Sequence, residues 1–105
     1  ETQCKHSMKT REVRFAKGAD DDLVRLYEFL VESDLDVAEE AIDVIRRALT
    51  MVAAFPFSCR KAALRSQLRE CLIPFRRTGY VAAFEIADDH ILILAVRHQR
   101  EDDFY

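Results

Sequence analysis

The aliphatic run Ile91–Val96, which reads ILILAV, constrains the fold more than any other part of the sequence. In a strand, successive side chains point to opposite faces, and this run is apolar at both sets of positions. Such a pattern is typical of a strand that other parts of the protein cover on both faces. We therefore expect Ile91–Val96 to be a central strand of a sheet.

Two amphipathic helices are predicted before this strand. The first follows the acidic start GADDD and repeats large apolar residues at the spacing of one helix face: Leu23, Leu26, Tyr27 and Leu30. The second has a longer apolar face, made of Ala38, Ala41, Ile42, Ile45, Leu49 and Val52. Between them, ESDLD offers Ser33, Asp34 or Asp36 as a helix cap, and Phe55-Pro56 is expected to end the second helix. Because the connector is short, the helices should pair as an antiparallel hairpin.

The remaining segments indicate strands joined by turns. EVRFA at Glu12–Ala16 predicts a short first strand, and Leu68–Phe75 and Tyr80–Ile86 predict two more before the aliphatic run. RRTG predicts a hairpin turn in which Gly79 is the residue expected to need a positive φ. Phe57–Gln67 has no clear period and is expected to be an irregular connection with at most one helical turn. The expected fold class is α+β: an N-terminal strand, an antiparallel helical hairpin and a three-stranded antiparallel meander.

Composition indicates a small globular protein of the cell interior. The chain has 105 residues, of which 50% are hydrophobic and 33% are charged. We expect one domain at residues 11–105, and we treat residues 1–10 as an extension that is disordered or foreign to the native chain. No apolar run is long enough to span a bilayer, so no membrane partner is expected. Cys4, Cys59 and Cys71 form neither a CxxC pair nor a zinc-ligand spacing with histidine; we expect buried thiols in a reducing cytoplasm, and neither a metal nor another cofactor.

Charge is divided between two regions of the chain. From Gly18 to Ile45, the acidic residues face a single basic residue, Arg25. From Arg46 to Arg77 the balance reverses, and Glu70 is the only acid. The division suggests two surfaces with different partners; the alternative is an acidic face and a basic face that contact only solvent.

A dense cluster of ionisable residues, RHQRE at Arg97–Glu101, follows the aliphatic run. If the strand continues without interruption, Arg97 shares a face with Ile93, and His98 shares the opposite face with Leu94. This stretch alone then cannot place a complete catalytic set on one face. We favour His98 as a hydrogen-bonded residue at the edge of the core over His98 as a catalytic acid or base.

Four segments, in this order and at this spacing, resemble the ParE/RelE superfamily of small bacterial toxins. They are VRFAKGADDDLVRLYEFL, AAFPFSCR, LRECLIPFRRTGYVAAFEI and ILILAVRHQREDDFY, and the resemblance extends from Arg11 to Tyr105. It implies the toxin of a type II toxin–antitoxin pair, silenced by a co-produced antitoxin protein. In this superfamily the ParE branch poisons DNA gyrase, and the RelE branch cleaves messenger RNA in the ribosomal A site. Because both branches share the fold, the fold does not choose between them.

The RelE-like alternative requires a base, an acid and cations around the scissile phosphate. The resemblance would distribute these roles among Arg69, Arg76, Arg97, His98, Arg100 and Tyr105. The lysine pair of the RelE branch is missing, and Glu101, Asp102 and Asp103 would repel a phosphate backbone. RHQRE is also more similar to the ParE branch, so we favour gyrase inhibition without catalysis by the toxin itself. A non-toxic family member that only binds an antitoxin is the third interpretation.

Two binding surfaces follow from the gyrase interpretation, because arginine is enriched at interface hot spots and binds carboxylates in a bidentate manner. The expected target-binding residues are Arg60, Lys61, Arg65, Arg69, Arg97 and Arg100. The family resemblance implies an antitoxin with a disordered tail that folds across the toxin, with a helix in a groove and, as a second element, a strand added to a sheet edge. The residues expected to bind it are Leu23, Leu26, Tyr27, Leu30, Arg46 and Arg76. The apolar members of this set are expected mostly in the core, with leftover patches available to the partner.

Overall fold

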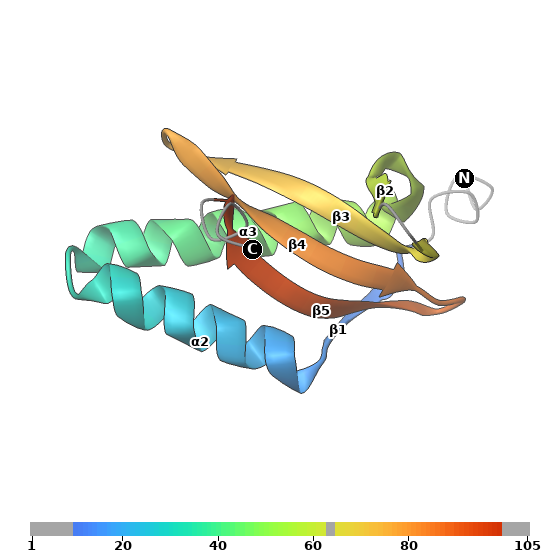
Figure 1. The fold of residues 1–105 in the computed structure, drawn as a ribbon, viewed down its shortest axis with the longest axis horizontal. Helices are drawn as coiled ribbons and strands as arrows, with labels where there is room; N and C mark the ends of the chain where they lie inside the picture. The colour runs from blue at the N-terminus through green and yellow to red at the C-terminus, as the bar shows by residue number, and fades with distance from the viewer. Residues whose placement is uncertain (1–9, 63–64, 100–105) are drawn as a thin grey trace, which may run out of the picture.

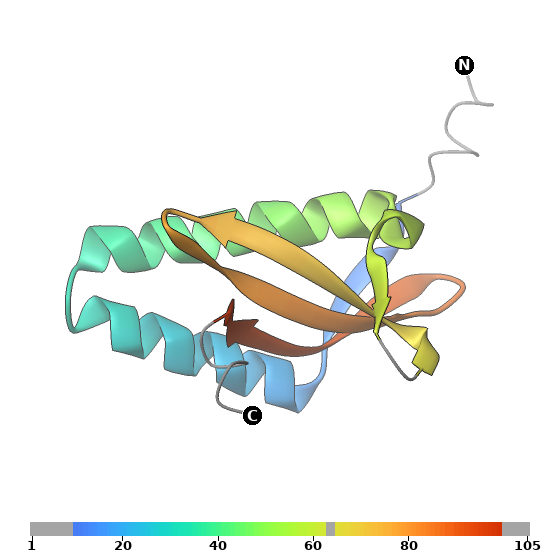
Figure 2. The ribbon, with the colours of Figure 1, turned by 45° about the horizontal axis from the view of Figure 1, so that its top comes forward.

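The computed structural model describes residues 10–62 and 65–99, which form a five-stranded sheet with two helices packed on one face (Figure 1 and Figure 2). The strands are β1 (Glu12–Phe15), β2 (Arg60–Ala62), β3 (Arg65–Phe75), β4 (Thr78–Ile86) and β5 (His90–His98). The helices are α2 (Lys17–Val31) and α3 (Leu35–Ala54), and a short 3-10 helix, η1 (Pro56–Ser58), follows α3.

The strand order across the sheet is β1-β5-β4-β3-β2. Strands β3, β4 and β5 form the expected antiparallel meander, and β1 pairs with β5 in the parallel direction. The sheet is therefore mixed, and the α+β fold class is confirmed. β5 lies between β1 and β4, so the prediction that the aliphatic run is an interior strand is also confirmed.

The helical hairpin matches the sequence prediction closely. Asp34 is the cap of α3, since its Oδ1 accepts hydrogen bonds from the backbone N–H of Asp36 at 2.9 Å and of Val37 at 3.4 Å. α3 ends at Ala54, just before the proline of η1. Its buried residues are Ala38, Ala41, Ile45, Leu49, Val52 and Ala53. Neither helix of the described chain combines the length and the apolar composition needed to cross a membrane.

The helices cover only one face of the sheet, as Figure 2 shows. On the covered face, Ile91 and Ile93 of β5 are 0% exposed and belong to the main core cluster. On the opposite face Leu92 is only partly buried, as is Leu94. The prediction that the aliphatic run is covered by packed elements on both faces is therefore wrong for the part of the chain that the structure describes.

A bulge in β5 changes which residues share a face. Ala83 of β4 lies opposite Ala95, but the next residue, Phe84, lies opposite Ile93, so Leu94 is an extra residue in β5. Beyond the bulge, Val96 is 0% exposed on the covered face, and His98 follows it there at the strand period. The predicted uninterrupted alternation is wrong, because one inserted residue exchanges the two faces.

The region predicted as irregular, Phe57–Gln67, contains η1, β2 and the start of β3. β2 is a three-residue edge strand antiparallel to β3, with Arg60 opposite Glu70 and Lys61 opposite Arg69. Such a short strand carries too few residues for its period to appear in the sequence. It is held in place by the longer neighbouring strand.

Gly79 does not have a positive φ, so this prediction is wrong; Arg76 has φ 55° instead. The pair Phe75–Thr78 closes a loop of two residues, and such tight hairpins need a left-handed residue to match the twist of the strands. Gly79 lies in β4 and has a different role, because a Cβ built there would be 2.7 Å from the carbonyl oxygen of Ile73.

Candidate functional site

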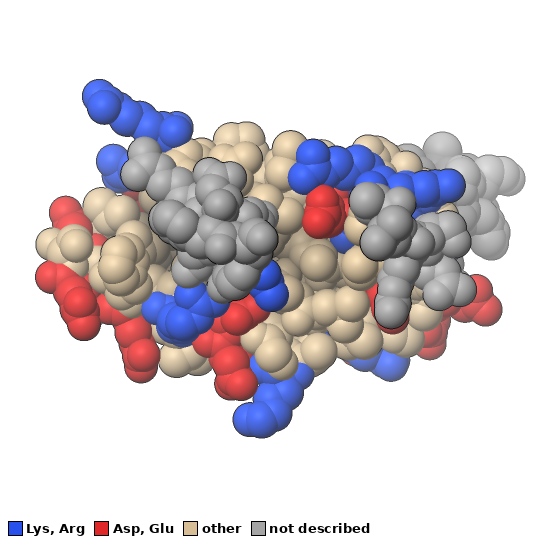
Figure 3. Space-filling model, viewed as in Figure 1, with Lys and Arg blue, Asp and Glu red and all other residues tan. Residues whose placement is uncertain are grey.

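A cluster of cationic and aromatic side chains lies where η1 and β2 meet the edge of the sheet; we call it the basic edge. It consists of Arg11, Phe57, Arg60, Lys61 and Arg69. Phe57 is 63% exposed, and the guanidinium carbons of Arg11 and Arg69 lie 5.6 and 5.2 Å from the centre of its ring. Both distances are within the range of cation–π attraction. Figure 3 shows Lys and Arg side chains gathered over β2 and the adjacent part of β3.

Backbone contacts fix the position of the basic edge. A guanidinium N–H of Arg69 donates to the carbonyl of Cys59 at 2.8 Å, and Nε of Arg11 donates to the carbonyl of Ala87 at 2.8 Å. Arg60 pairs with Glu70 across the strands at 3.0 Å. Because these contacts hold the side chains, the basic edge presents its charges in a defined geometry.

The structure separates the expected target-binding residues into two places. Arg60, Lys61 and Arg69 belong to the basic edge, whereas Arg97 lies on β5, opposite Val81, on the face that the helices leave uncovered. Arg65 belongs to β3, but its side chain lies outside the description, as does the whole of Arg100. Sequence reasoning missed Arg11 and Phe57, because only the fold brings these two segments beside Arg69.

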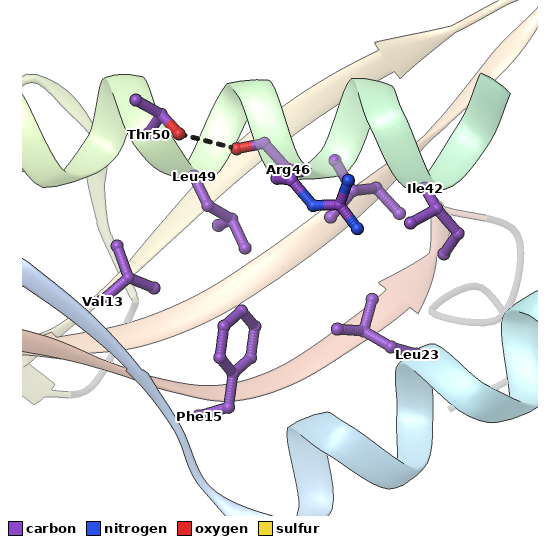
Figure 4. A pocket seen from close by; sticks show the side chains of 8 residues that line it. Val13, Phe15, Leu23, Ile42, Arg46, Leu49 and Thr50 are labelled. Atoms are coloured by element: carbon purple, nitrogen blue, oxygen red, sulfur yellow. Dashed lines mark hydrogen bonds between the residues drawn. The ribbon is translucent and has the colours of Figure 1, made fainter. Parts of the chain in front are cut away.

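An apolar cavity of about 290 Å³ lies between β1, α2 and α3. Figure 4 shows Arg46 of α3 extending over it, with Phe15 of β1 and Leu23 of α2 on the other side. Its lining is Val13, Phe15, Leu23, Ile42, Ile45, Arg46, Leu49 and Thr50. Arg46 is the only charged residue in this lining, so the cavity suits an apolar group that carries an acidic neighbour.

A second and larger cavity, of about 640 Å³, lies between the C-terminal half of α2, the start of α3 and the β3–β4 hairpin. Its apolar lining is Leu26, Phe29, Leu30, Val37, Phe75 and Tyr80, and its polar lining is Arg25, Arg76, Thr78 and His98. Arg76 also pairs with Glu40 of α3 at 2.6 Å, which links the hairpin turn to the helix. Like the first cavity, this one combines an apolar floor with arginines.

His98 lies in the lining of this second cavity, where its side chain contacts Thr78 and Tyr80. Its Nε2 lies 3.2 Å from the hydroxyl oxygen of Thr78, and its ring meets the edge of the Tyr80 ring, with the centroids 5.4 Å apart. Tyr80 itself is 2% exposed. This is the hydrogen-bonded position at the edge of the core that the sequence favoured.

Of the candidate nuclease residues that the structure describes, Arg76 and His98 both line the larger cavity, but Arg69 and Arg97 lie elsewhere. Arg69 and Arg76 are seven positions apart on an extended strand and its turn, or about 23 Å. Arg97 and His98 lie on opposite faces of the sheet. Arg100 and Tyr105 are outside the described residues. The described residues also contain no group of three or more potential metal ligands.

The expected antitoxin-binding residues are divided between the core and the two cavities. Leu26 is 5% exposed and part of the core, although it also lines the larger cavity. Leu23 and Arg46 line the smaller cavity, and Leu30 and Arg76 line the larger one. Tyr27 is partly buried on α2 and belongs to neither lining.

Residues 13–103 match the model of a family described as "ParE toxin of type II toxin-antitoxin system, parDE". No curated protein matches the sequence.

Solved structures with the same fold include members of two toxin–antitoxin systems. A chain of the chromosomal ParDE system from P. aeruginosa aligns with a TM-score of 0.69 and 17% identity, over 88% of this chain and 97% of that one. A chain of the RelBE2 toxin–antitoxin complex from Mycobacterium tuberculosis aligns with a TM-score of 0.60 and 23% identity, over 88% and 94%. A conserved hypothetical protein from Helicobacter pylori aligns with a TM-score of 0.54 and 18% identity, over 86% and 96%.

Proposed function

Because the chain belongs to the ParE toxin family of type II toxin–antitoxin systems, we propose that it arrests growth by inhibiting DNA gyrase and that a cognate antitoxin silences it. Inhibition of this kind requires an interface with the target and no transition-state chemistry from the toxin. The observation that carries the proposal is the basic edge, where arginines flank an exposed phenylalanine on a rigid sheet margin. Arginine and aromatic residues are the side chains most enriched at binding hot spots.

Arg69 and Arg97 lie away from the cavity that Arg76 and His98 share, and this separation favours an interface over catalysis. General acid–base cleavage of RNA needs its proton donor and acceptor within hydrogen-bond reach of one phosphate. Among the described candidates, Arg97 and His98 are separated by the sheet itself. RelE-like cleavage of messenger RNA therefore remains the alternative that the tests below must separate from gyrase inhibition.

The antitoxin is proposed to occupy the two cavities. Both linings combine apolar side chains with arginine, namely Arg46 in the smaller cavity and Arg25 and Arg76 in the larger one. This chemistry fits an amphipathic helix whose apolar face carries flanking acids. The proposed partner is thus an acidic helical segment of the antitoxin, lying along the α2–α3 hairpin.

A supercoiling assay tests the proposed target. Purified toxin at a stoichiometric excess over gyrase is expected to block supercoiling, and Arg69→Ala combined with Lys61→Ala is expected to weaken the block at least tenfold. The matched control is Arg47→Ala, whose residue pairs with Asp43 at 2.9 Å on the outer side of α3 and is expected to have no effect. A wild-type toxin that leaves supercoiling untouched would remove the proposal.

Labelling in cells separates the two target classes. If gyrase is the target, induced expression lowers thymidine incorporation before methionine incorporation. The reverse order would favour RelE-like cleavage, and growth without arrest would indicate a family member that only binds its antitoxin. Co-expression of the antitoxin is expected to restore growth in the first two cases.

A further inference from the structure

Two cysteines are brought together at the junction of η1, β2 and β3. In the antiparallel pairing of β2 with β3, Arg60 lies opposite Glu70 and Lys61 opposite Arg69. Cys59 directly precedes β2, and extending this register by one step brings it opposite Cys71, to which its side chain is hydrogen-bonded. Directly opposed residues in such a pair have Cα atoms about 4.5–5.5 Å apart, and a disulfide spans about 4.4–6.8 Å.

Both thiols are free and partly buried, and both pack against the hydrophobic core. The expectation of buried thiols is therefore met only in part by these two residues, and Cys4 lies outside the described chain. Partial burial matters here because exchange with a small disulfide requires that the reagent reach the thiol. The backbone of Cys59 is held by the hydrogen bond from Arg69 to its carbonyl, which limits the movement of one partner.

The two side chains affect each other electrostatically. Burial first, and then the neighbouring Cys59 through charge repulsion and a hydrogen bond between the side chains, together raise the pKa of the Cys71 thiol to about 12. Cys71 therefore keeps its proton at neutral pH and is a poor nucleophile for the first step of thiol–disulfide exchange.

We propose that Cys59 and Cys71 form a cross-strand dithiol that closes to an intrachain disulfide by exchange with a small-molecule disulfide such as oxidised glutathione. In the first step the Cys59 thiolate attacks one sulfur of the reagent, releases a glutathione thiolate and forms a mixed disulfide. In the second step Cys71 transfers its proton to the released thiolate or to solvent, and its sulfur attacks the Cys59 sulfur. A second glutathione leaves, so two protein thiols are oxidised and one small disulfide is reduced.

Closure would tie the start of the basic edge to β3 at a second point. The disulfide would close a loop that contains β2, and cross-linking of a loop stabilises the folded state by restricting the unfolded one. Any effect on gyrase inhibition rests on the proposed function, whereas the thiol chemistry does not. The two are therefore measured separately.

Intact-mass spectrometry of the Cys4→Ser variant tests the exchange. After incubation with oxidised glutathione at pH 8, the expected product has lost two hydrogens, about 2 Da, and carries no glutathione. Trypsin cleaves at Arg60, Lys61, Arg65 and Arg69, between the two cysteines, so the disulfide appears as a linked peptide pair that a reductant separates. Two glutathione adducts, or two unreacted thiols, would overturn the proposal.

Single variants test the order of the steps. With Cys71→Ser added, the mixed disulfide at Cys59 is expected to accumulate; with Cys59→Ser added, the reaction of Cys71 is expected to be at least tenfold slower than that of Cys59. Equal rates for the two cysteines would contradict the assigned order. The oxidised protein should also unfold about 10 °C higher than the reduced protein, and an unchanged melting temperature would contradict the cross-link at the edge of the sheet.

Discussion

The carboxylate of Asp22 on α2 accepts a hydrogen bond from the backbone N–H of Val96 at 3.0 Å, two residues beyond the extra residue of the β5 bulge. Its other oxygen lies 3.2 Å from a guanidinium nitrogen of Arg25. At a bulge, some backbone N–H and C=O groups lose their regular hydrogen-bond partners in the neighbouring strand. Here the side chain of a helix residue provides the acceptor for one such N–H. The contact joins α2 to β5, the strand in which His98 lies on the covered face.

Asp22→Ala is expected to lower the free energy of unfolding by about 1–3 kcal/mol, because it leaves a partly buried N–H without its acceptor. Asp22→Asn keeps an oxygen acceptor and should cost less. Urea denaturation measures both. Asp21→Ala is the control, since Asp21 makes only an exposed contact with Lys17 at 3.9 Å. Equal losses for Asp22→Ala and Asp21→Ala would show that the contact does not stabilise the fold.

Substitution by alanine is expected to change the stability of the fold in opposite directions at the two glycines. In Gly79→Ala, the new Cβ would meet the Ile73 carbonyl at 2.7 Å, and the backbone must shift, so we expect a loss of about 2 kcal/mol or more. In Gly18→Ala, the nearest atom is the Leu94 carbonyl oxygen at 3.5 Å, and the site is in α2, so we expect a neutral or slightly stabilising effect. Guanidinium denaturation of the two variants, compared with wild type, decides between these expectations. Similar effects at both sites would contradict the close-approach argument.

Arg76 combines a strained backbone with a side-chain contact. Its φ of 55° favours glycine, while its ion pair with Glu40 is exposed on both sides and contributes at most about 1 kcal/mol. Arg76→Gly is therefore expected to be nearly neutral, because relief of the strain offsets the lost ion pair. Arg76→Val should cost about 1–2 kcal/mol, since a β-branched residue tolerates this φ poorly. Comparable losses for glycine and valine in thermal denaturation would rule out backbone strain as the main cause.

Two neighbouring arginines on α3 can be used to test which side of the helix binds the antitoxin. Arg46 lines the smaller cavity, whereas Arg47 pairs with Asp43 away from it. Arg46→Ala is expected to weaken antitoxin binding about tenfold by removing the one charge in the lining, and Arg47→Ala should leave it unchanged. Isothermal titration with purified antitoxin measures both affinities. A larger loss for Arg47→Ala would place the partner on the other side of the helix.

The regular elements of the fold could be predicted from the sequence because their periodicity is long and consistent. α3, with its apolar face and its Asp34 cap, was predicted to within a few residues. The bulge in β5 was not predictable, because ILILAV is apolar throughout and gives no sign of an inserted residue at Leu94. The assignment of His98 to a face failed for that reason.

The candidate site was predicted only in part. Arg60, Lys61 and Arg69 lie close together along the chain and could be grouped by charge. Arg11 and Phe57 could not be grouped with them, because their proximity depends on the packing of β1, η1 and β3. Short-range patterns also missed β2, which exists only as the partner of β3.

The parallel pairing of β1 with β5 has a consequence for synthesis. Glu12 meets His90, and Phe15 meets Ile93, so the earliest strand has no neighbour in the sheet until translation has passed the final one. At about 5–20 residues per second, the time between synthesis of β1 and synthesis of β5 is on the order of 5–15 s. Pairing between strands so far apart in the sequence is also intrinsically slow to form. The sheet is therefore completed late, after nearly all of the described chain has left the ribosome.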